Sequence, residues 1–483
     1  MSTFQKENQK MTNWRWWICL LLFVATTVNY MDRQVLSLTW KDYIAPEFHW
    51  TDSDYGTITG FFSIFYAVAC LFAGKFVDWM GTKKGYLWAI GVWSLGACMH
   101  AGCGWATMKI EGVESIEALI AIEAGSQLAL AVATASVWLF LTCRAILALG
   151  EAGNFPAAIK VTAEYFPKKD RAFATSLFNA GASVGALAAP LTIPSLASKF
   201  GWEMAFIIIG ALGFVWMFFW MYMYDKPQNS KHVNKAELDY VQQDAVNEPE
   251  VKQQPEKEEK AIPFLQCFGY KQTWSFIAGK FFTDGVWWFY LFWAPAYFSE
   301  CGYTMQTTEG KMLVFVLYLI VTVISIFGGY LPKLFVEKKG MEPYAGRMRA
   351  MLIFAFFPLF ALFAQPLQGY SVWFPAIIIG LAGAGHQAWS ANLFSTIGDM
   401  FPKSTIATIT GIGAMAGGLA SFLINKGAGM LFDYAAETQM TFLGFVGKPA
   451  GYFVIFCICA FAYLIGWSIM KILVPKHKMI VLD

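Results

Sequence analysis

The chain has 483 residues, of which 57% are hydrophobic and only 14% are charged, and its formal net charge is +2. This composition excludes an ordinary soluble globular domain, and the near-neutral charge predicts no nucleic-acid partner. The nine cysteines are scattered without metal-ligand spacing, so we expect no metal, no other cofactor and no disulfide framework. The composition therefore predicts a polytopic membrane protein.

Twelve apolar segments long enough to span a membrane follow one another along the chain, since a spanning helix needs about 20 largely apolar residues. They lie at 16–38, 54–76, 85–107, 128–152, 171–193 and 203–224, and then at 274–298, 311–332, 350–366, 372–397, 405–430 and 450–474. The polar N-terminus enters the first segment without a small-residue cleavage site, which predicts no signal peptide. We expect an all-α membrane protein with six helices in residues 1–224 and six in residues 273–483.

A polar stretch, residues 225–272, separates the two sets of six. It contains the mixed-sign run Val251–Lys260, which cannot bury a core and predicts a solvated cytoplasmic linker. Basic residues gather in alternate short loops, which places these loops and both termini in the cytoplasm. These residues are Lys83, Lys84, Lys168, Lys169, Arg171, Lys333, Lys338, Lys339, Arg347, Arg349, Lys403, Lys476 and Lys478. The cytoplasmic membrane is the expected location.

Charged side chains interrupt two of the apolar segments. Arg144 and Glu151 are seven residues apart in the fourth segment, which places them within about 20° around a helix and about 10 Å along it. Asp32 and Arg33 lie in the first segment. A charge facing lipid costs at least about 2.5–3.5 kcal/mol, so these groups should face protein or a watery cavity. They form either a structural ion pair between helices or part of a transport site.

The loop after the second segment contains Gly74, Asp78 and Gly81 in the pattern Gly-x3-Asp-x2-Gly. Between the second and third of twelve spans, this pattern resembles the loop signature of the major facilitator superfamily. The resemblance implies the major facilitator fold, two six-helix bundles, and a gating role for these three residues. In that signature, glycine permits close helix approach, and the aspartate meets a helix end and basic side chains across the inner gate. An ordinary tight cytoplasmic turn is the alternative.

Four further stretches narrow the resemblance. Asn29–Arg33 in the first segment, and Arg144 with Gly150–Pro156 in the fourth, resemble the anion:cation symporter branch of that superfamily. Thr283–Phe298 and His386–Pro402 resemble its hexuronate transporters. The resemblance covers nearly the whole chain outside the linker and two enlarged outer loops, at about Lys109–Gln127 and Asp433–Lys448. It implies proton-coupled import of glucuronate or galacturonate by alternating access, with two bundles moving around a site at the membrane midplane.

The charged residues can be assigned roles in such transport. The membrane potential opposes entry of an anion by about 2.3 kcal/mol per charge per 100 mV, so a coupled proton and a titratable carboxylate are needed. Asp32 and Glu151 are the candidates for proton coupling. We expect Arg33 to bind the substrate carboxylate with its planar fork, and Arg144 to pair with Asp32 or Glu151 and set their proton affinity. The reverse assignment of the two arginines remains open.

Aromatic and polar side chains could bind the sugar itself. Tyr30 and Tyr66 would supply ring faces and hydroxyl groups. In the tenth segment His386, Trp389 and Asn392 recur every three residues and share one arc of a helix. Because the chain holds 20 Trp and 44 Phe, aromatic residues facing lipid or core are the ordinary alternative, and His386 could be a core histidine.

Two other features of the second half bear on the site. Lys280 and Asp284 are four apart in the seventh segment and are expected to pair, with either a structural or a functional role. Related sugar-acid symporters often carry an asparagine or glutamine in helices five and eleven, but the stretches 178–183 and 411–415 differ from that pattern.

Two other classes of function are alternatives to symport. An enzyme would need a metal cluster or a nucleophile and base, and the sequence has no such constellation, so we expect no enzymatic activity. A receptor would not need two titratable carboxylates. Within transport, the alternative is symport of another organic anion, such as the aldonates galactonate and gluconate. The expected partners are a sugar-acid anion, a proton and membrane lipid, and the expected state is a monomer.

Overall fold

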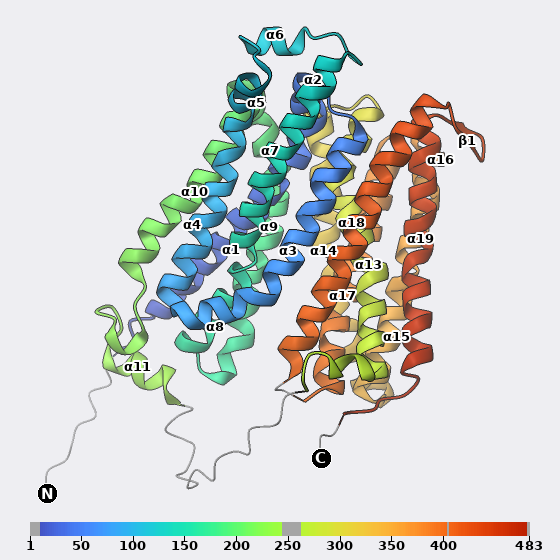
Figure 1. Ribbon diagram of the computed structural model, residues 1–483. Helices are drawn as coiled ribbons and strands as arrows, with labels where there is room; N and C mark the ends of the chain where they lie inside the picture. Colours follow the sequence, from blue (N-terminus) through green and yellow to red (C-terminus); the bar gives the residue numbers. More distant parts are fainter. Residues whose placement is uncertain (1–9, 244–261, 403–404, 481–483) are drawn as a thin grey trace, which may run out of the picture.

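The computed structural model describes residues 10–243, 262–402 and 405–480, and within them the chain is almost entirely helical (Figure 1). Most of the predicted run Val251–Lys260 and its surroundings, residues 244–261, lies outside the described residues. The strands β1 (Thr441–Phe442) and β2 (Phe445–Val446) form one short antiparallel hairpin. The predicted all-α class is confirmed.

The helices of the first half follow the predicted segments. They are α1 (Trp14–Thr39), α2 (Ala45–Phe48), α3 (Asp52–Met80), α4 (Thr82–Met99), α5 (Cys103–Glu111), α6 (Ile116–Ile120), α7 (Gln127–Glu151), α8 (Asn154–Tyr165), α9 (Lys168–Phe200), α10 (Trp202–Met223) and α11 (Lys235–Val241). In the second half they are α13 (Lys271–Glu300), α14 (Thr308–Lys339), α15 (Pro343–Ala355), α16 (Ala364–Gln368), α17 (Trp373–Met400), α18 (Ile406–Glu437) and α19 (Lys448–Leu473).

Eight helices in the described part of the chain are long and apolar enough to cross a membrane. The four predicted segments outside this group, at 16–38, 85–107, 274–298 and 372–397, also fold as helices and correspond to α1, α4 with α5, α13 and α17. Charged side chains inside α1 and α13 reduce the apolarity of those two helices. The count of twelve spans stays a prediction.

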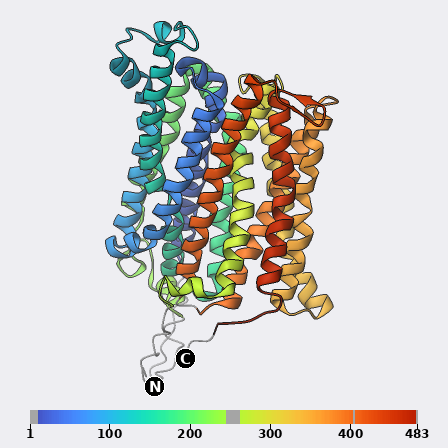
Figure 2. The same cartoon turned by 45° about the vertical axis from the view of Figure 1, so that its right-hand side comes forward.

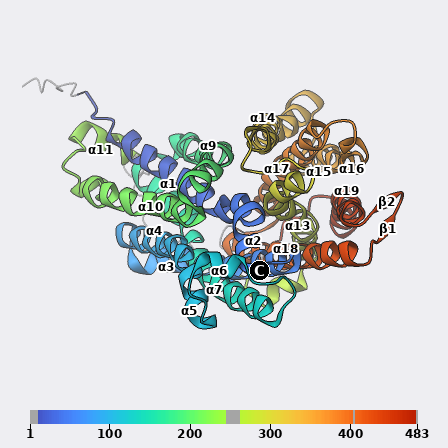
Figure 3. The same ribbon diagram turned by 90° about the horizontal axis from the view of Figure 1, so that it is seen from above.

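The two halves of the chain lie side by side (Figures 1 and 3). Helices from the first half, coloured blue to green, occupy one side, and those from the second half, coloured yellow to red, occupy the other. The largest contact between the halves runs along α3 and α18. Within the first half α1 packs on α9, and within the second half α14 packs on α17. The start of α1 and the end of α19 lie at one end of the molecule, and α6 and the hairpin lie at the other (Figures 1 and 2).

Glycines allow α1 to approach α9 closely. A Cβ at Gly181 would lie 2.4 Å from the Phe23 carbonyl oxygen, and one at Gly185 would lie 2.4 Å from that of Thr27. Only glycine fits these positions without moving the backbone of α1. This seam holds the segment of α1 that carries Tyr30 and the charged residues after it.

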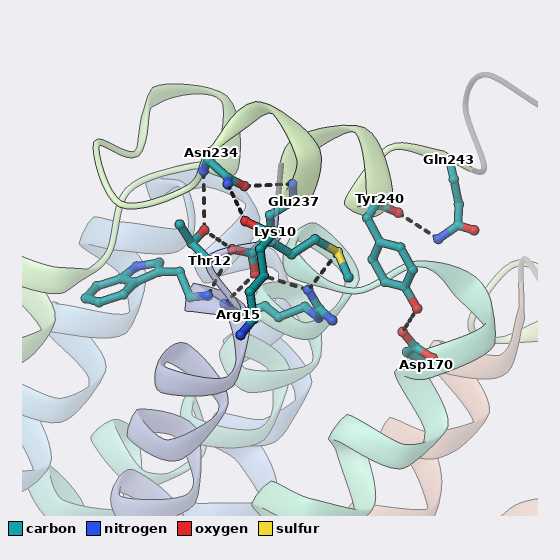
Figure 4. A network of polar contacts seen from close by, with 10 residues as sticks. Lys10, Thr12, Arg15, Asp170, Asn234, Glu237, Tyr240 and Gln243 are labelled. Atoms are coloured by element: carbon teal, nitrogen blue, oxygen red, sulfur yellow. Dashed lines mark hydrogen bonds and ion pairs between the residues drawn. The ribbon is translucent and has the colours of Figure 1, made fainter. Parts of the chain in front are cut away.

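A short helix of the linker region, α11, anchors the start of α1 (Figure 4). The buried Glu237 carboxylate accepts the backbone N–H groups of Trp14 at 2.9 Å and Arg15 at 3.0 Å, and pairs with the Arg15 guanidinium at 3.2 Å. A carboxylate is favoured there because the first N–H groups of a helix lack partners within it. Tyr240 of α11 donates to Asp170 of α9 at 2.7 Å. The contacts tie α11 to the first half.

Polar contacts between the halves gather toward the end that carries α6 and the hairpin. Asp433 of α18 accepts the N–H groups of Asp52 and Ser53 at 3.0 and 2.7 Å, and Lys448 of α19 bridges Asp52 and Glu300 at 2.7 and 2.9 Å. Within the described ranges, every hydrogen bond and ion pair joining the halves lies between this end and the middle of α3. The halves are therefore fastened at one end of the molecule.

Candidate functional site

Arg33, in the last third of α1, and Glu151, the last residue of α7, form a buried ion pair. The Nε and Nη2 atoms of Arg33 both donate to Oε2 of Glu151, at 3.1 and 2.8 Å. The relative exposure is 5% for Arg33 and 1% for Glu151. Oε1 of Glu151 has no hydrogen-bond partner among the described residues. The ion pair therefore occupies one carboxylate oxygen of Glu151 and leaves the other without a hydrogen bond from the described chain.

Three aromatic rings surround the Arg33 guanidinium. Its central carbon lies 5.3 Å from the Tyr30 ring centre, 4.6 Å from that of Tyr66 and 5.3 Å from that of Trp288. All three aromatic side chains are partly exposed. Trp288 comes from α13, so the second half of the chain contributes directly to the surroundings of Arg33. The predicted grouping of Tyr30, Tyr66 and Arg33 is present in the structure. Trp288 lies within the hexuronate-like stretch but was not singled out from sequence, where its type is too common to stand out.

Asp32 and Arg144 lie beside the Arg33–Glu151 pair with polar atoms left unsatisfied. Neither carboxylate oxygen of Asp32 and neither side-chain amide atom of Asn29 has a partner in the described ranges, nor does Nη1 of Arg144. Arg144 and Glu151 both lie within electrostatic reach of Asp32. Buried polar groups without partners are costly, which is why they concentrate where a protein performs chemistry or binds a ligand.

The ion pair predicted for Arg144 is not formed in this structure, so this prediction is wrong. We expected Arg144 to pair with Asp32 or Glu151, but Glu151 pairs with Arg33, and Arg144 forms no ion pair within the described residues. Its guanidinium lies instead 5.3 Å from the ring centre of Phe62 on α3. The seven-residue spacing places Arg144 and Glu151 on one face, but the neighbouring helix decides which cation reaches the carboxylate.

The polar side chains predicted in the tenth segment point into the second half. Nδ1 of His386 lies 2.7 Å from the Tyr463 hydroxyl, and the imidazole stacks on Trp287 with ring centres 5.2 Å apart. The Asn392 amide donates to the carbonyl oxygens of Gly328 and of the preceding turn, both at 2.8 Å. These contacts fasten α17 to its neighbours α14, α13 and α19.

Trp389 is fully buried between the other two and packs edge-on against Tyr463, with ring centres 5.6 Å apart. Its indole N–H has no partner in the described part of the chain. The three residues share an arc, as expected from their spacing. Their predicted sugar-binding role finds no support in the contacts of His386 and Asn392.

The predicted gating residues lie at the junction of α3 and α4. Oδ1 of Asp78 pairs with Lys160 of α8 at 2.7 Å, so the aspartate meets a basic side chain, but one from its own half. Gly81 adopts a φ of 78°, which favours glycine and explains its presence between the two helices. Nothing lies within 4 Å of a Cβ placed on Gly74, so the expected close approach of a helix there is wrong in this arrangement.

Asn425 of α18 is a polar residue that the sequence analysis missed. Its Oδ1 accepts the Trp293 indole N–H at 2.9 Å, and its Nδ2 donates to Ser421, whose hydroxyl lies 2.7 Å from that of Ser63 on α3. The stretch 411–415 of the eleventh segment carries no amide side chain, whereas Asn425 lies ten residues farther along. A single buried asparagine farther along the same apolar segment was the available signal.

In the described residues no group of three or more His, Cys, Asp or Glu side chains could hold a metal ion. Residues 22–424 match the Major Facilitator Superfamily. The chain belongs to this superfamily. It is accordingly a multi-pass transporter of the cytoplasmic membrane and not an enzyme, and its relatives place it near the hexuronate transporters.

Three comparisons show the range of similar proteins. The hexuronate transporter of Escherichia coli (strain K12) is 28% identical over 430 residues, covering 88% of this chain and 89% of the relative. A probable galactarate/D-glucarate transporter of the same strain is 25% identical over 299 residues, 60% of each chain. The solved structure of a bacterial homolog of the human lysosomal transporter Spinster, inward-facing and unoccupied, covers 96% of this chain and 98% of its own at 16% identity, with a TM-score of 0.66. This last likeness shows the fold.

Proposed function

We propose that the protein is a proton-coupled symporter that imports hexuronates such as glucuronate or galacturonate. The observation that carries this proposal is the buried Arg33, held by Glu151 and by aromatic rings from both halves, beside the unpaired carboxylate of Asp32. A guanidinium suits a carboxylate because its fork can donate two parallel hydrogen bonds. The partly exposed rings of Tyr30, Tyr66 and Trp288 offer flat apolar faces to a sugar.

The Arg33–Glu151 pair supports an exchange mechanism. A substrate carboxylate that binds Arg33 takes the place of Glu151, which then lies buried without its cation. A buried carboxylate in that position is stable only when protonated, because the charged form would be neither solvated nor paired. Substrate binding and proton binding therefore favour one another, which is the linkage that symport requires.

Asp32 and Arg144 complete the charge balance of the site. Together with Arg33 and Glu151 they make two acids and two bases in one buried region, so the arrival of an anion leaves one negative charge in excess. Uptake of one proton by Asp32 or Glu151 restores neutrality. Arg144 lies within reach of both acids and biases which of them takes the proton.

Alternating access follows from the placement of this site between the halves. We propose twelve spans with both termini cytoplasmic, two bundles (1–224 and 273–483) joined by a cytoplasmic linker (225–272), and a functional monomer. The polar contacts that join the halves then lie at the outer end, and the molecule faces the cytoplasm. Asp78 with Lys160, flanked by Gly74 and Gly81, would act at the opposite, inner gate.

The test is transport by the purified protein in liposomes with an imposed pH gradient. Wild-type protein should concentrate labelled galacturonate. Asp32→Asn and Glu151→Gln should abolish concentration, since neither amide titrates, while at least one of them should still exchange substrate down its own gradient. Glu114→Gln, at an exposed position between α5 and α6, is the matched control and should concentrate substrate normally. Proton-driven accumulation by both site variants would refute the coupling role.

A second candidate is symport of another organic anion. The 25% identical relative named as a probable galactarate/D-glucarate transporter favours it, and aldonates such as galactonate or gluconate present the same single carboxylate to Arg33. Competition of labelled galacturonate uptake by aldonates, aldarates and uronates separates these substrates.

A further inference from the structure

A second buried ion pair lies in the other half of the molecule. Nζ of Lys280 lies 2.5 Å from Oδ2 of Asp284, one turn farther along α13, which confirms the pairing expected from their spacing. The relative exposure is 7% for the lysine and 9% for the aspartate. The Arg33–Glu151 mechanism does not use this pair. Charges inside a membrane-spanning helix are costly and mark substrate or ion pathways more often than they stabilise the fold.

The pair lies on the same helix as Trp288, which contacts the first half of the chain. Lys280, Asp284 and Trp288 follow one another at intervals of four, so they share a stripe along α13. Trp288 at one end of this stripe contacts the Arg33 guanidinium. On α3, the sulfur of Cys70 lies within electrostatic reach of both Arg33 and Lys280. The two cations therefore approach one region from opposite halves.

The surroundings of Lys280 leave its ammonium group able to change partner. The half-exposed ring of Phe394 on α17 lies 4.7 Å from Nζ, and no residue of the described chain other than Asp284 forms an ion pair with it. Asp284 is held more firmly, because α18 packs against it so closely that a Cβ at Gly417 would lie 2.3 Å from its Oδ2. The lysine side chain can therefore move to a new partner, whereas the carboxylate of Asp284 is held in place.

We propose that Lys280 is a second anion-binding group, which takes the far carboxylate of a linear six-carbon sugar diacid while Arg33 binds the near one. This deepens the proposed function and rests on it. The two halves then have parallel designs, each with a cation held by a resident carboxylate that the substrate displaces. Lys280 and Trp288 are about 12 Å apart along α13, and the lysine side chain extends toward Asp284, halfway between them. A ligand with a charge at each end contacts both halves and draws them together.

The test compares two ligands that differ at one carbon. Galactarate is galacturonate with its aldehyde carbon oxidised to a second carboxylate, so a change in the ratio of their affinities between wild type and a Lys280 variant isolates the second charge. In the purified full-length protein, galactarate should displace labelled galacturonate and bind at least as tightly. Lys280→Met should lower the galactarate-to-galacturonate affinity ratio roughly 10- to 100-fold, the cost of losing one charge-assisted contact. Lys280→Arg should restore much of it.

Two further variants keep the result interpretable. Lys333→Met breaks an exposed pair of the same four-residue spacing on α14, where Lys333 and Glu337 are 62% and 61% exposed, and should leave the ratio unchanged. The double variant Lys280→Met with Asp284→Leu removes both charges and so avoids a stranded buried acid; it should fold and show the same lowered ratio. An unchanged ratio in a folded double variant would overturn the proposal.

The outcome also separates this proposal from the symport proposal. If galacturonate is transported but galactarate neither competes nor moves, Lys280 is not a second anion-binding group, and hexuronate symport stands. If neither acid binds the wild-type protein, hexuronate symport itself fails.

Discussion

The two ends of one helix, α1, carry buried arginine–glutamate pairs of opposite character. At its start, the two oxygens of Glu237 accept from the Thr12 hydroxyl, two backbone N–H groups and the Arg15 guanidinium. Farther along, Glu151 receives only Arg33 on one oxygen, and the neighbouring Asp32 receives nothing among the described residues. An ion pair whose carboxylate accepts hydrogen bonds at both oxygens stabilises the fold. An ion pair whose carboxylate has a free oxygen can be broken more easily, so that its arginine can bind a ligand instead.

The largest effect should come from replacing each arginine with lysine. Arg33→Lys should weaken hexuronate binding roughly 100-fold, because an ammonium group cannot reproduce the two parallel hydrogen bonds of the fork. Arg15→Lys should leave affinity close to that of the wild type, since the carboxylate of Glu237 keeps its backbone donors. Equilibrium binding of labelled galacturonate to the purified variants measures both. Near-normal affinity for Arg33→Lys would remove the basis for a bidentate contact.

Replacing a carboxylate at each end of α1 should have the opposite order of effects on stability. The change at Glu237 should destabilise the protein more than the change at Asp32. Glu237→Gln should lower the free energy of unfolding by about 1–3 kcal/mol, because four donors lose a charged acceptor. Asp32→Asn should leave stability unchanged or raise it, since it removes a buried charge without breaking a hydrogen bond. Thermal unfolding in detergent without ligand tests this order. A larger loss for Asp32→Asn than for Glu237→Gln would show that Asp32 has a stabilising partner.

The same reasoning applies to the tenth segment. Asn392→Ala removes two hydrogen bonds, one that fastens α17 to α14 and one to the preceding turn of α17, so it should lower stability by about 1–2 kcal/mol. Its effect on affinity should be equal for glucuronate and for single-deoxy analogues, because the amide is already occupied by backbone carbonyls. Binding titrations with the analogue series give the answer. A selective loss for one analogue would restore the direct sugar contact that spacing had indicated.

Sequence periodicity predicted most of the helices, and the charges within them predicted which side chains would lie near one another. The charges interrupting apolar segments located Asp32, Arg33 and Glu151 correctly in one region, because an intramembrane charge has few uses other than function. The choice between Arg33 and Arg144 as the partner of Glu151 could not be predicted. That choice depends on where α1 lies relative to the end of α7, which spacing within one helix does not reveal.

The tenth segment illustrates a second limit. Spacing correctly placed His386, Trp389 and Asn392 on one arc, but an arc does not reveal whether it faces a ligand or a neighbouring helix. Here α14 and α19 occupy that face. Asn425 was missed for the opposite reason, since one asparagine in an apolar run carries no periodic signal.

The effect expected to matter least for transport concerns an acid of α2, between α1 and α3. Burial raises the pKa of the Glu47 carboxyl from its ordinary value of 4.5 to about 7, although its hydrogen bond from the Trp202 indole N–H, at 2.7 Å, acts in the opposite direction. Between those two pH values the folded protein binds more protons at Glu47 than the unfolded chain does. Stability should therefore be greatest below about pH 4.5 for this group and should fall as the pH rises to about 7.

Glu47→Gln keeps an acceptor for Trp202 but cannot titrate, so it should flatten this part of the stability profile. The contribution removed is about 1–3 kcal/mol across the window. Thermal midpoints at about pH 5 and about pH 8 should differ less for Glu47→Gln than for wild type, while Glu114→Gln, at an exposed neighbouring position, should follow wild type. An identical pH dependence in wild type and Glu47→Gln would mean that Glu47 stays ionised in the folded protein. Among the described residues, Arg144 acts on Asp32 whereas no arginine acts on Glu47, so titration of Glu47 should affect stability without affecting transport.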